Sequence, residues 1–439
     1  MKFYSTNNKT VLISLKEAVL QGLAADNGLY MPESIPAMPA DFFGGMHEKD
    51  FRQIALAVAD KFIGEDIPNT ELQRIIDHTI AFDAPLVEVE RNISALELFH
   101  GPTMAFKDFG ARFMSQLLRF FSSQVKREIV ILVATSGDTG SAVANGFLGV
   151  EGIRVIVLYP AGKVSDIQEK QFTTLGQNIT AVEVDGTFDD CQRLVKTAFL
   201  DNDLREQYFL TSANSINIAR LIPQSFYYFY AYSQRKEKSA PVVFSVPSGN
   251  FGNLTAGLLA KKMGLPVARF VASTNINDVV PQYLASGHLV PRPSVHTLSN
   301  AMDVGNPSNF ARMVDLYDGH LNAIQEDVIG YAFTDSDTKA AMLSVSRKQK
   351  YILDPHGAVG YLGLKKYLEG CNDDVNGIFL ETAHPAKFKD VVELAIDKPI
   401  PLPGTLEKFV KGNKQSLAVS HDYHAFKKIL IDTLVVSHT

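Results

Sequence analysis

The sequence predicts an α/β protein with two doubly wound domains, each built on a mostly parallel sheet, behind an N-terminal segment that is mostly helical. Short apolar runs such as IVILVAT (129–135) and PVVFSVP (241–247) are typical of strands buried on both faces of a parallel sheet. These runs alternate with amphipathic helical patterns, as expected when right-handed crossovers join parallel strands. The chain of 439 residues is also too long for one ordinary hydrophobic core, which indicates several domains.

The predicted N-terminal domain, residues 1–95, is mostly helical. Amphipathic patterns predict helices at 15–25, 51–64 and 71–82, and three prolines favour an extended chain at 29–39. Nothing in this segment has the composition of an active site. We expect it to pack against the rest of the chain and to support closure of the site.

Two α/β domains follow, at residues 96–235 and 236–439, and a charged stretch at 233–240 marks the predicted boundary between them. Strands are expected at 129–135, 154–160, 179–186 and 208–214 in the first domain, and at 241–247, 268–274 and 377–383 in the second. Open parallel sheets bind ligands at the carboxyl ends of their strands. The turns that lead from strands into helices are therefore the places to search for a site.

Composition and charge narrow the class of protein. A net charge of −6 without a basic block argues against a nucleic-acid partner. No apolar run is long enough to span a membrane, and the N-terminus lacks the layout of a secretory signal, so a cytoplasmic location is predicted. The two cysteines, Cys191 and Cys371, are far apart and lack metal-ligand spacing, so neither a disulfide framework nor a metal site is expected.

The stretch LFHGPTMAFKDFG (98–110) contains the lysine around which the site is predicted. Lys107 opens an amphipathic helical run, where the helix dipole disfavours a cation, and it is flanked by Met104, Phe106 and Phe109. A lysine with poor hydration has a lowered pKa and suits a nucleophile that forms a Schiff base. The alternative is a surface lysine whose stem covers an apolar patch while its amine reaches water.

Three strand-to-helix turns supply polar groups at the carboxyl ends of the predicted strands. The first, ATSGDTGSAVANGF (134–147), offers an anion the backbone N–H groups and hydroxyls of Ser136, Gly137, Thr139 and Gly140, although a simple helix cap would use the same residues. The second, SVPSGNFGNLTAG (245–257), contains a glycine- and amide-rich phosphate cradle that matches neither a Walker A loop nor the dinucleotide fingerprint; the cradle consists of Ser248, Gly249, Asn250, Phe251, Gly252 and Asn253. The third, FLETAHPAKF (379–388), places Thr382 at the end of a strand, where it is either a ligand-facing hydroxyl or a cap.

An amine nucleophile, a phosphate cradle and an anion-binding loop together fit pyridoxal 5'-phosphate better than any other common cofactor. In this hypothesis the cofactor aldehyde reacts with Lys107 and the cofactor phosphate lies in the cradle of residues 248–253. The loop at 135–140 then binds the carboxylate of the substrate.

The chain resembles the threonine synthase family, which belongs to fold type II of the pyridoxal-phosphate enzymes and shares its architecture with the tryptophan synthase β subunit. The resemblance is to the longer bacterial and fungal subgroup, and it covers the chain from end to end. It is carried by AVLQGLAADNGLYMPE (18–33), ELFHGPTMAFKDFGARFM (97–114), ATSGDTGSAVA (134–144), SANSINIARL (212–221), SVPSGNFGNLTAGLLAKKMGLP (245–266), TLSNAMDVGNPSN (297–309) and ETAHPAKF (381–388). The resemblance implies conversion of O-phospho-L-homoserine and water to L-threonine and phosphate.

The resemblance also implies roles for individual residues. Lys107 is the catalytic lysine, the cradle binds the cofactor phosphate, and Thr382 faces the pyridine nitrogen. Residues implied to bind the substrate carboxylate are Thr135, Ser136, Thr139 and Gly140. Asn214 and Arg220, with Lys163 as a weaker candidate, are implied to bind the substrate phosphate, which a planar guanidinium suits; a surface ion pair is the alternative for Arg220.

Asp138 departs from the wider fold-type pattern, because many relatives carry Asn beside the phenolic oxygen of the cofactor. A carboxylate that faces a phenolate is unfavourable unless a proton is shared. We therefore expect Asp138 and the cofactor to titrate as a coupled pair.

Other functions remain open at this point. A phospho-lyase or dehydratase would use the same lysine and cradle and would release a 2-oxo acid and ammonia. A non-catalytic binding protein of the same fold would be expected to lose Lys107 or the cradle. A nucleotide-binding protein would need an acidic partner for the ribose after a glycine loop, and neither loop has a clear one. The predicted assembly is a monomer or a small homo-oligomer.

Overall fold

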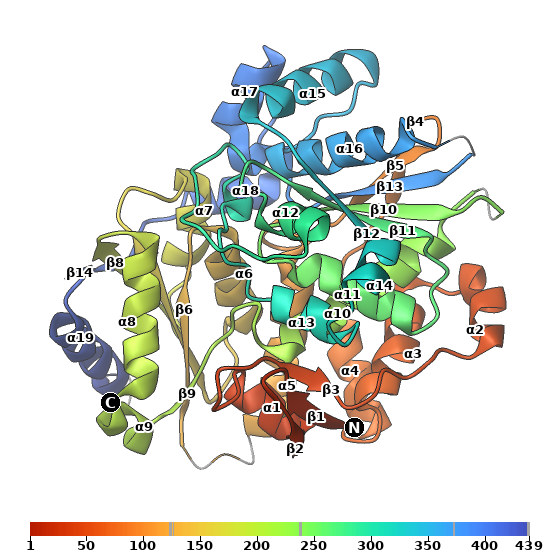
Figure 1. Ribbon diagram of the computed structural model, residues 1–439. Coiled ribbons are helices and arrows are strands. Elements are labelled where there is room, and N and C mark those ends of the chain that lie inside the picture. Colours follow the sequence, from red (N-terminus) through yellow and green to blue (C-terminus); the bar gives the residue numbers. More distant parts are fainter. Residues whose placement is uncertain (123–124, 126, 237–238, 372–373, 437–439) are drawn as a thin grey trace.

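Two large, mostly parallel sheets organise the protein (Figure 1). The computed structural model describes residues 1–122, 125, 127–236, 239–371 and 374–436. One sheet has the order β14-β8-β7-β6-β9 and is parallel throughout, with strands β6 (Ile129–Ala134), β7 (Ile153–Pro160), β8 (Ile179–Asp185), β9 (Phe209–Thr211) and β14 (Leu417–Ser420). The other has the order β12-β11-β10-β13-β5-β4, with strands β4 (Leu86–Glu90), β5 (Ile93–Glu97), β10 (Val242–Pro247), β11 (Arg269–Thr274), β12 (Val328–Ala332) and β13 (Asn376–Glu381). The α/β class and the parallel pairing predicted from the buried apolar runs are confirmed.

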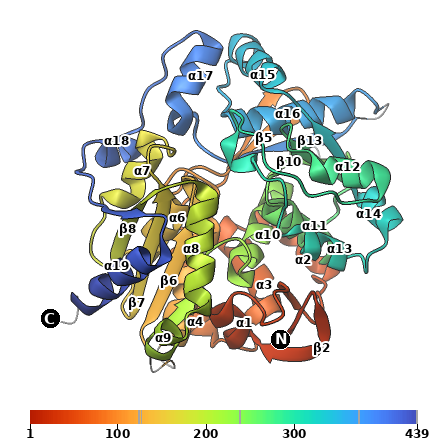
Figure 2. The same cartoon turned by 60° about the vertical axis from the view of Figure 1, so that its left-hand side comes forward.

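The helices cover both faces of the first sheet (Figure 2). Apolar residues of α8 (Phe188–Leu200) and α19 (Tyr423–Val436) share a core cluster with one set of side chains from β6 and β7, while α5 (Lys107–Ser122) and α6 (Asp138–Phe147) share another cluster with the alternate set. Helix α10 (Ile218–Ser233) contacts α5 and α11 (Gly252–Lys262). This packing joins the helix that begins at Lys107 to the helix that follows the cradle.

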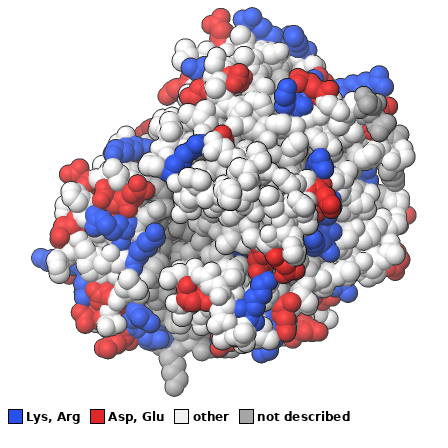
Figure 3. All heavy atoms as spheres, viewed as in Figure 1, with Lys and Arg blue, Asp and Glu red and all other residues white. Residues whose placement is uncertain are grey.

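The structure contains further helices and short helical turns. They are α7 (Asp166–Thr173), α9 (Asn202–Gln207), α12 (Val279–Ser286), α13 (Phe310–Asp315), α14 (Leu321–Asp327), α15 (Asp335–Lys348), α16 (Pro355–Leu368), α17 (Lys389–Ile396) and α18 (Gly404–Val410), with short 3-10 turns η2 (Asn300–Met302) and η3 (Pro385–Phe388). Within the described residues, none of the helices has both the length and the apolar character needed to cross a membrane. On the face shown in Figure 3, Lys and Arg side chains are interspersed with Asp and Glu.

The N-terminal segment contains the expected helices and also strands that were not predicted. Helices α1 (Leu15–Gln21), α2 (Ala40–Gly45), α3 (Phe51–Ile63) and α4 (Asn69–Thr79) and the turn η1 (Met46–Glu48) accompany a small antiparallel sheet of β1 (Lys2–Ser5), β2 (Asn8–Ser14) and β3 (Tyr30–Pro32). The first helix ends earlier than the predicted 15–25, because Gly22 has a φ of +71° and donates its N–H to Ala18.

The sheets also cross the predicted domain boundaries at 95 and 235. Strands β4 and β5, which begin inside the segment predicted to be helical, pair with each other, and β5 pairs in parallel with β13. Strand β14, from the end of the chain, extends the first sheet beside β8. The layers are therefore assembled from segments that lie far apart in the sequence.

Candidate active site

Lys107 lies where the chain before α5 meets the end of β13. The N–H of Phe106 donates to the carbonyl of Thr382 at 2.9 Å, and Ala105 forms an isolated antiparallel bridge with Ala383. Met104 accepts from the N–H of His384 at 3.0 Å. These main-chain contacts fix Lys107 beside Thr382, as the sequence analysis required if both belong to one site.

The Lys107 amine has the electrostatic character of a nucleophile. Burial lowers its pKa to about 8; Asp138 opposes this shift, while Lys387 and Arg220 reinforce it. Within the described part of the chain the amine makes no hydrogen bond or ion pair, and it lies 5.9 Å from the centre of the Phe106 ring. A pKa of about 8 leaves a larger neutral fraction near neutral pH than an ordinary lysine has, and only the neutral amine is nucleophilic.

The loop between β6 and α6 is shaped by Thr135. Its hydroxyl accepts from the N–H of Gly137 at 3.0 Å and from that of Gly140 at 2.8 Å. A Cβ at Gly140 would lie 2.4 Å from the Thr135 methyl, and Gly137 has a φ of +143° that favours glycine. The Thr135 hydroxyl is thus used inside the loop, whereas Ser136 is exposed and Thr139 partly exposed.

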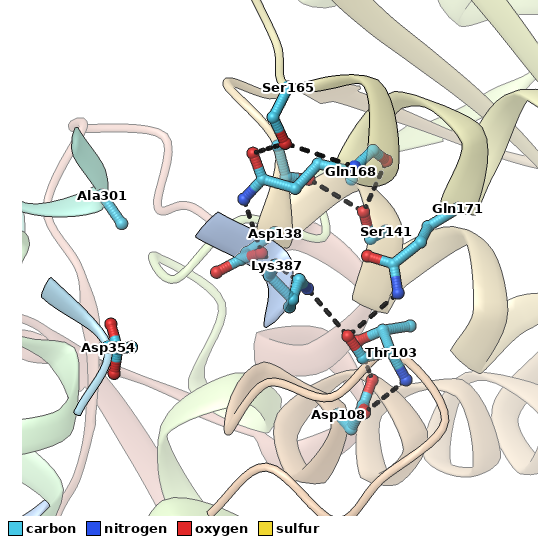
Figure 4. Close-up of polar contacts among 12 residues, drawn as sticks. Thr103, Asp108, Asp138, Ser141, Ser165, Gln168, Gln171, Ala301, Asp354 and Lys387 are labelled. Carbon is cyan, nitrogen blue, oxygen red and sulfur yellow. Dashed lines mark hydrogen bonds and ion pairs between the residues drawn. The ribbon is translucent and has the colours of Figure 1, made fainter. Parts of the chain in front are cut away.

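Asp138 has a partner that the sequence analysis missed. The Lys387 amine lies 2.7 Å from its Oδ1, the Gln168 amide donates to the same oxygen at 2.8 Å, and both side chains of the ion pair are buried (Figure 4). Burial alone would raise the pKa of Asp138, but Lys387, the nearby Lys107 and these hydrogen bonds hold it well below its usual range. Lys387 therefore compensates the charge of Asp138, and the expected coupled titration of Asp138 with the cofactor stays a prediction.

The cradle of residues 248–253 has the geometry of an anion site. Phe251 has a left-handed φ of +61° and precedes α11, which begins at Gly252 and exposes its first N–H groups toward the turn. The hydroxyls of Tyr227 and Tyr228 both donate to Oδ1 of Asn253 at 2.7 Å, which fixes the orientation of the amide. Its Nδ2 is buried and has no hydrogen-bond partner among the described residues, so it fits a phosphate oxygen.

The other cradle residues connect this turn to its neighbours. The Ser248 hydroxyl donates to the carbonyl of Val246 at 2.9 Å. The Asn250 side chain donates to the Ser215 hydroxyl at 3.2 Å and accepts from the N–H of Ser308 at 2.7 Å. Asn250 therefore links the cradle to the loop that carries Asn214.

Close packing at Gly249 leads to a testable prediction. A Cβ there would lie 2.6 Å from Cα of Met302 and 2.8 Å from the carbonyl oxygen of Ala301, and both are backbone atoms that cannot rotate away. We expect Gly249→Ala to cost about 1–3 kcal/mol and to weaken pyridoxal phosphate binding about 5- to 150-fold, measured by fluorescence titration. Gly44→Ala, where a Cβ meets no atom within 4 Å, is the matched control, and equal affinities for the two variants would contradict the prediction.

Arg220 is a buried cation rather than a member of a surface ion pair. Its Nη1 donates to the carbonyl of Ala213 at 2.5 Å, and among the described residues its Nε has no hydrogen-bond partner. In the described ranges no carboxylate lies within ion-pair distance of it; burial lowers its pKa to about 10, and Asp108 opposes that shift. The Oδ1 of Asn214 is also buried and unpartnered, whereas Lys163 follows β7 and is exposed.

Comparisons with known proteins identify relatives over nearly the whole chain. Family models match residues 2–80 ("Threonine synthase N terminus"), 81–378 ("Pyridoxal-phosphate dependent enzyme") and 357–430 ("Threonine synthase, C-terminal"). The chain is 48% identical over 409 residues to threonine synthase of Haemophilus influenzae, covering 93% of this chain and 94% of that protein. It is 43% identical over 433 residues to that of Escherichia coli, covering 98% of this chain and all of that protein.

The chain belongs to the threonine synthase family. Its fold is also similar to a crystal structure of pyridoxal-phosphate-bound threonine synthase from Brucella melitensis, with a TM-score of 0.93, 33% identity and coverage of 98% of each chain. The family confirms the α/β prediction and pyridoxal phosphate as the cofactor.

In this threonine synthase family member, a buried acidic cluster behind Thr382 was not singled out from the sequence. Glu381 accepts from the N–H of Asp354 at 2.7 Å, and burial together with Asp354 raises its pKa well above the usual range. Nδ1 of His356 lies 2.6 Å from Asp354, and its Nε2 accepts from the N–H of Ala301 at 3.2 Å. The cluster therefore supports the turn that packs on Gly249. Its signal in the sequence was Asp354-Pro355-His356-Gly357, a cap motif that is common in structural turns.

Proposed function

We propose that the protein converts O-phospho-L-homoserine and water to L-threonine and phosphate. The observation that carries this proposal is Arg220, a buried guanidinium that, among the described residues, has an unpartnered Nε and no carboxylate within ion-pair distance. It packs against Gly110 in the first turn of the helix that begins at Lys107. An uncompensated buried cation is costly unless an anion is bound. The phosphate of the substrate is an anion that fits it, since guanidinium and phosphate form paired hydrogen bonds.

The proposed cofactor residues combine the contacts of the cradle with the roles that the family resemblance implies for Thr382 and Asp138. Bound pyridoxal phosphate supplies an aldehyde that reacts with an amine and a ring that accepts electrons from the substrate carbon next to nitrogen. The Asn253 amide and the first N–H groups of α11 bind the cofactor phosphate, with Ser248, Gly249, Asn250 and Phe251 forming the turn. The hydroxyl of Thr382 would hold the pyridine nitrogen of the bound cofactor, and the Asp138 carboxylate would hold its phenolic oxygen.

The substrate is held at both ends while Lys107 moves a proton. Asn214 and Arg220 bind the phosphate of the substrate, and Lys163 is a peripheral cation. The carboxylate of the substrate binds to the loop of Ser136, Thr139 and Gly140. Thr135 shapes that loop. Nζ of Lys107 removes the proton from Cα of the substrate. Water must reach Cβ only after phosphate has left the γ carbon, so the site has to exclude water until then.

A product assay tests this function. Purified protein is incubated with O-phospho-L-homoserine and pyridoxal phosphate, and amino acids, 2-oxo acids and phosphate are quantified. Threonine and phosphate in equal amounts are expected. Phosphate with 2-oxobutyrate and no threonine would instead establish a phospho-lyase and refute the addition of water at Cβ. The cytoplasmic location and the monomer or small homo-oligomer stay predictions.

A further inference from the structure

Two lysines approach one carboxylate in the candidate site. Asp138, at the start of α6, is buried, and both Lys107 and Lys387 lie near enough to lower its pKa. Only the Lys387 amine is in ion-pair contact with it among the residues described, at 2.7 Å. The Lys107 amine is left without an ion-pair partner in the same set of residues.

Lys387 is held in this position from the opposite side. Its amine donates to the carbonyl of Thr103 at 2.7 Å, and that carbonyl also accepts from the Gln171 amide at 3.0 Å (Figure 4). The N–H and hydroxyl of Thr103 both donate to Asp108, at 2.9 and 2.6 Å. The Lys387 side chain is fully buried and lies between the fixed Thr103 carbonyl and Asp138.

Asp138 is fixed as well. The Gln168 amide donates to its Oδ1, and the other end of that amide accepts from the Ser165 hydroxyl at 3.0 Å. Because an ionised carboxylate only accepts hydrogen bonds, the amide nitrogen must face Asp138, and the amide oxygen is left to accept from Ser165. The carboxylate thus receives two charge-stabilising donors, from α7 and from η3, and neither comes from Lys107.

The arrangement decides which lysine is free to react. If Lys387 carried no charge, the nearest cation to the buried carboxylate would be Lys107, and a close pair would stabilise its ammonium form. An ammonium has no lone pair with which to attack an aldehyde. Other charged groups that face Lys107 are Arg220 on α10 and Lys387 itself, and both favour the neutral amine.

We propose that Lys387 is a positioning residue that holds Asp138 in a buried ion pair and so keeps the Lys107 amine unpaired and reactive toward the cofactor aldehyde. The inference rests on the proposed function only for the assignment of Lys107 as the amine that reacts with the cofactor. In the reaction, the Lys107 nitrogen forms a bond to the aldehyde carbon, and the aldehyde oxygen leaves as water with both protons of the amine.

The test measures the pH at which the amine reacts. The full chain is freed of cofactor, pyridoxal phosphate is added, and the rate at which the visible absorption band appears is recorded against pH. The unmodified protein should show a midpoint near the Lys107 pKa of about 8. Lys387→Met should raise the midpoint by about one unit or more, which lowers the rate at pH 7 about tenfold. Asp138→Asn should lower it, because Asp138 raises the Lys107 pKa.

Controls separate this role from loss of structure. Lys389→Met removes a half-exposed lysine close by in the sequence, whose amine lies 3.6 Å from Glu393, and should leave the midpoint unchanged. In the Asp138→Asn background, Lys387→Met should shift the midpoint less than it does alone, because its effect passes through Asp138. If Lys387→Met does not fold, Lys387→Gln removes the same charge with a polar side chain and should raise the midpoint in the same way.

The outcomes distinguish this inference from the proposed function. A midpoint unchanged by Lys387→Met or by Asp138→Asn would overturn the proposed role of Lys387. The expected shifts in a protein that makes no threonine would support the role of Lys387 and refute only the proposed reaction. No visible band in the unmodified protein would overturn both.

Discussion

Lys107→Ala is expected to lower kcat at least about 1000-fold, because one side chain serves as both the amine that holds the cofactor and the base at Cα. The visible absorption band of the holoenzyme should disappear together with activity. The amine makes no hydrogen bond or ion pair among the described residues, so its removal should leave the melting temperature of the cofactor-free chain nearly unchanged. Threonine formation, absorption spectra and thermal unfolding measure the three effects.

Lys196→Ala is the matched control for this variant, since Lys196 is an exposed residue of α8, remote in sequence from every residue assigned to the site. It should retain both the absorption band and the activity. Full activity together with an unchanged absorption band in Lys107→Ala would refute the assignment of Lys107 as the nucleophile. A lost band with normal threonine formation would show that the amine holds the cofactor but is not needed as a base.

Arg220→Met is expected to reduce kcat/KM by about 30- to 1000-fold, which corresponds to roughly 2–4 kcal/mol for a buried ion pair with the substrate phosphate. The free energy of unfolding should stay constant or rise, because an uncompensated buried guanidinium destabilises the free protein. Kinetics with O-phospho-L-homoserine and denaturant unfolding of the same samples measure both quantities. The combination of lost activity with retained stability is the signature of a binding residue.

Arg312 on α13 provides a contrast within the same molecule. It is also fully buried, but its guanidinium donates to the carbonyls of Tyr30, Ser215 and Ile216 and to the side chain of Asn309. Arg312→Met leaves those acceptors unpaired and should lower stability by about 1–3 kcal/mol. If Arg220→Met instead lost stability and kept its kcat/KM, Arg220 would be a structural residue and the substrate phosphate would bind elsewhere.

The sequence predicted the parts of the fold that follow from local burial. The runs that became β6 and β10 are apolar at successive positions, which only a strand covered on both faces explains well. The hairpin of β4 and β5 was missed because its turn contains Arg91 and Asn92, without the glycine that usually marks such a turn, although Asn92 adopts a φ of +63°. The pairing of β5 with β13 depends on tertiary packing, which no local pattern encodes.

The same distinction applies to the site. Lys107 and the cradle could be found because a lysine at a helix start and a glycine-rich turn after a strand are local signals. The partner of Asp138 could not be found in this way, since Lys387 lies in a different turn and comes to 2.7 Å of Asp138 only in the folded protein. The sequence also could not show whether Arg220 lies in a surface ion pair, because that depends on its burial in the folded protein.

The most direct test of the account is to identify the lysine that carries the cofactor. The holoenzyme is reduced with borohydride, which makes the bond between cofactor and amine permanent, and is then digested and mapped by mass spectrometry. The account predicts the label on Lys107, the amine that is unpaired and has a lowered pKa. A label on Lys387 would contradict it, because the lysine described here as the partner of Asp138 would then be the nucleophile.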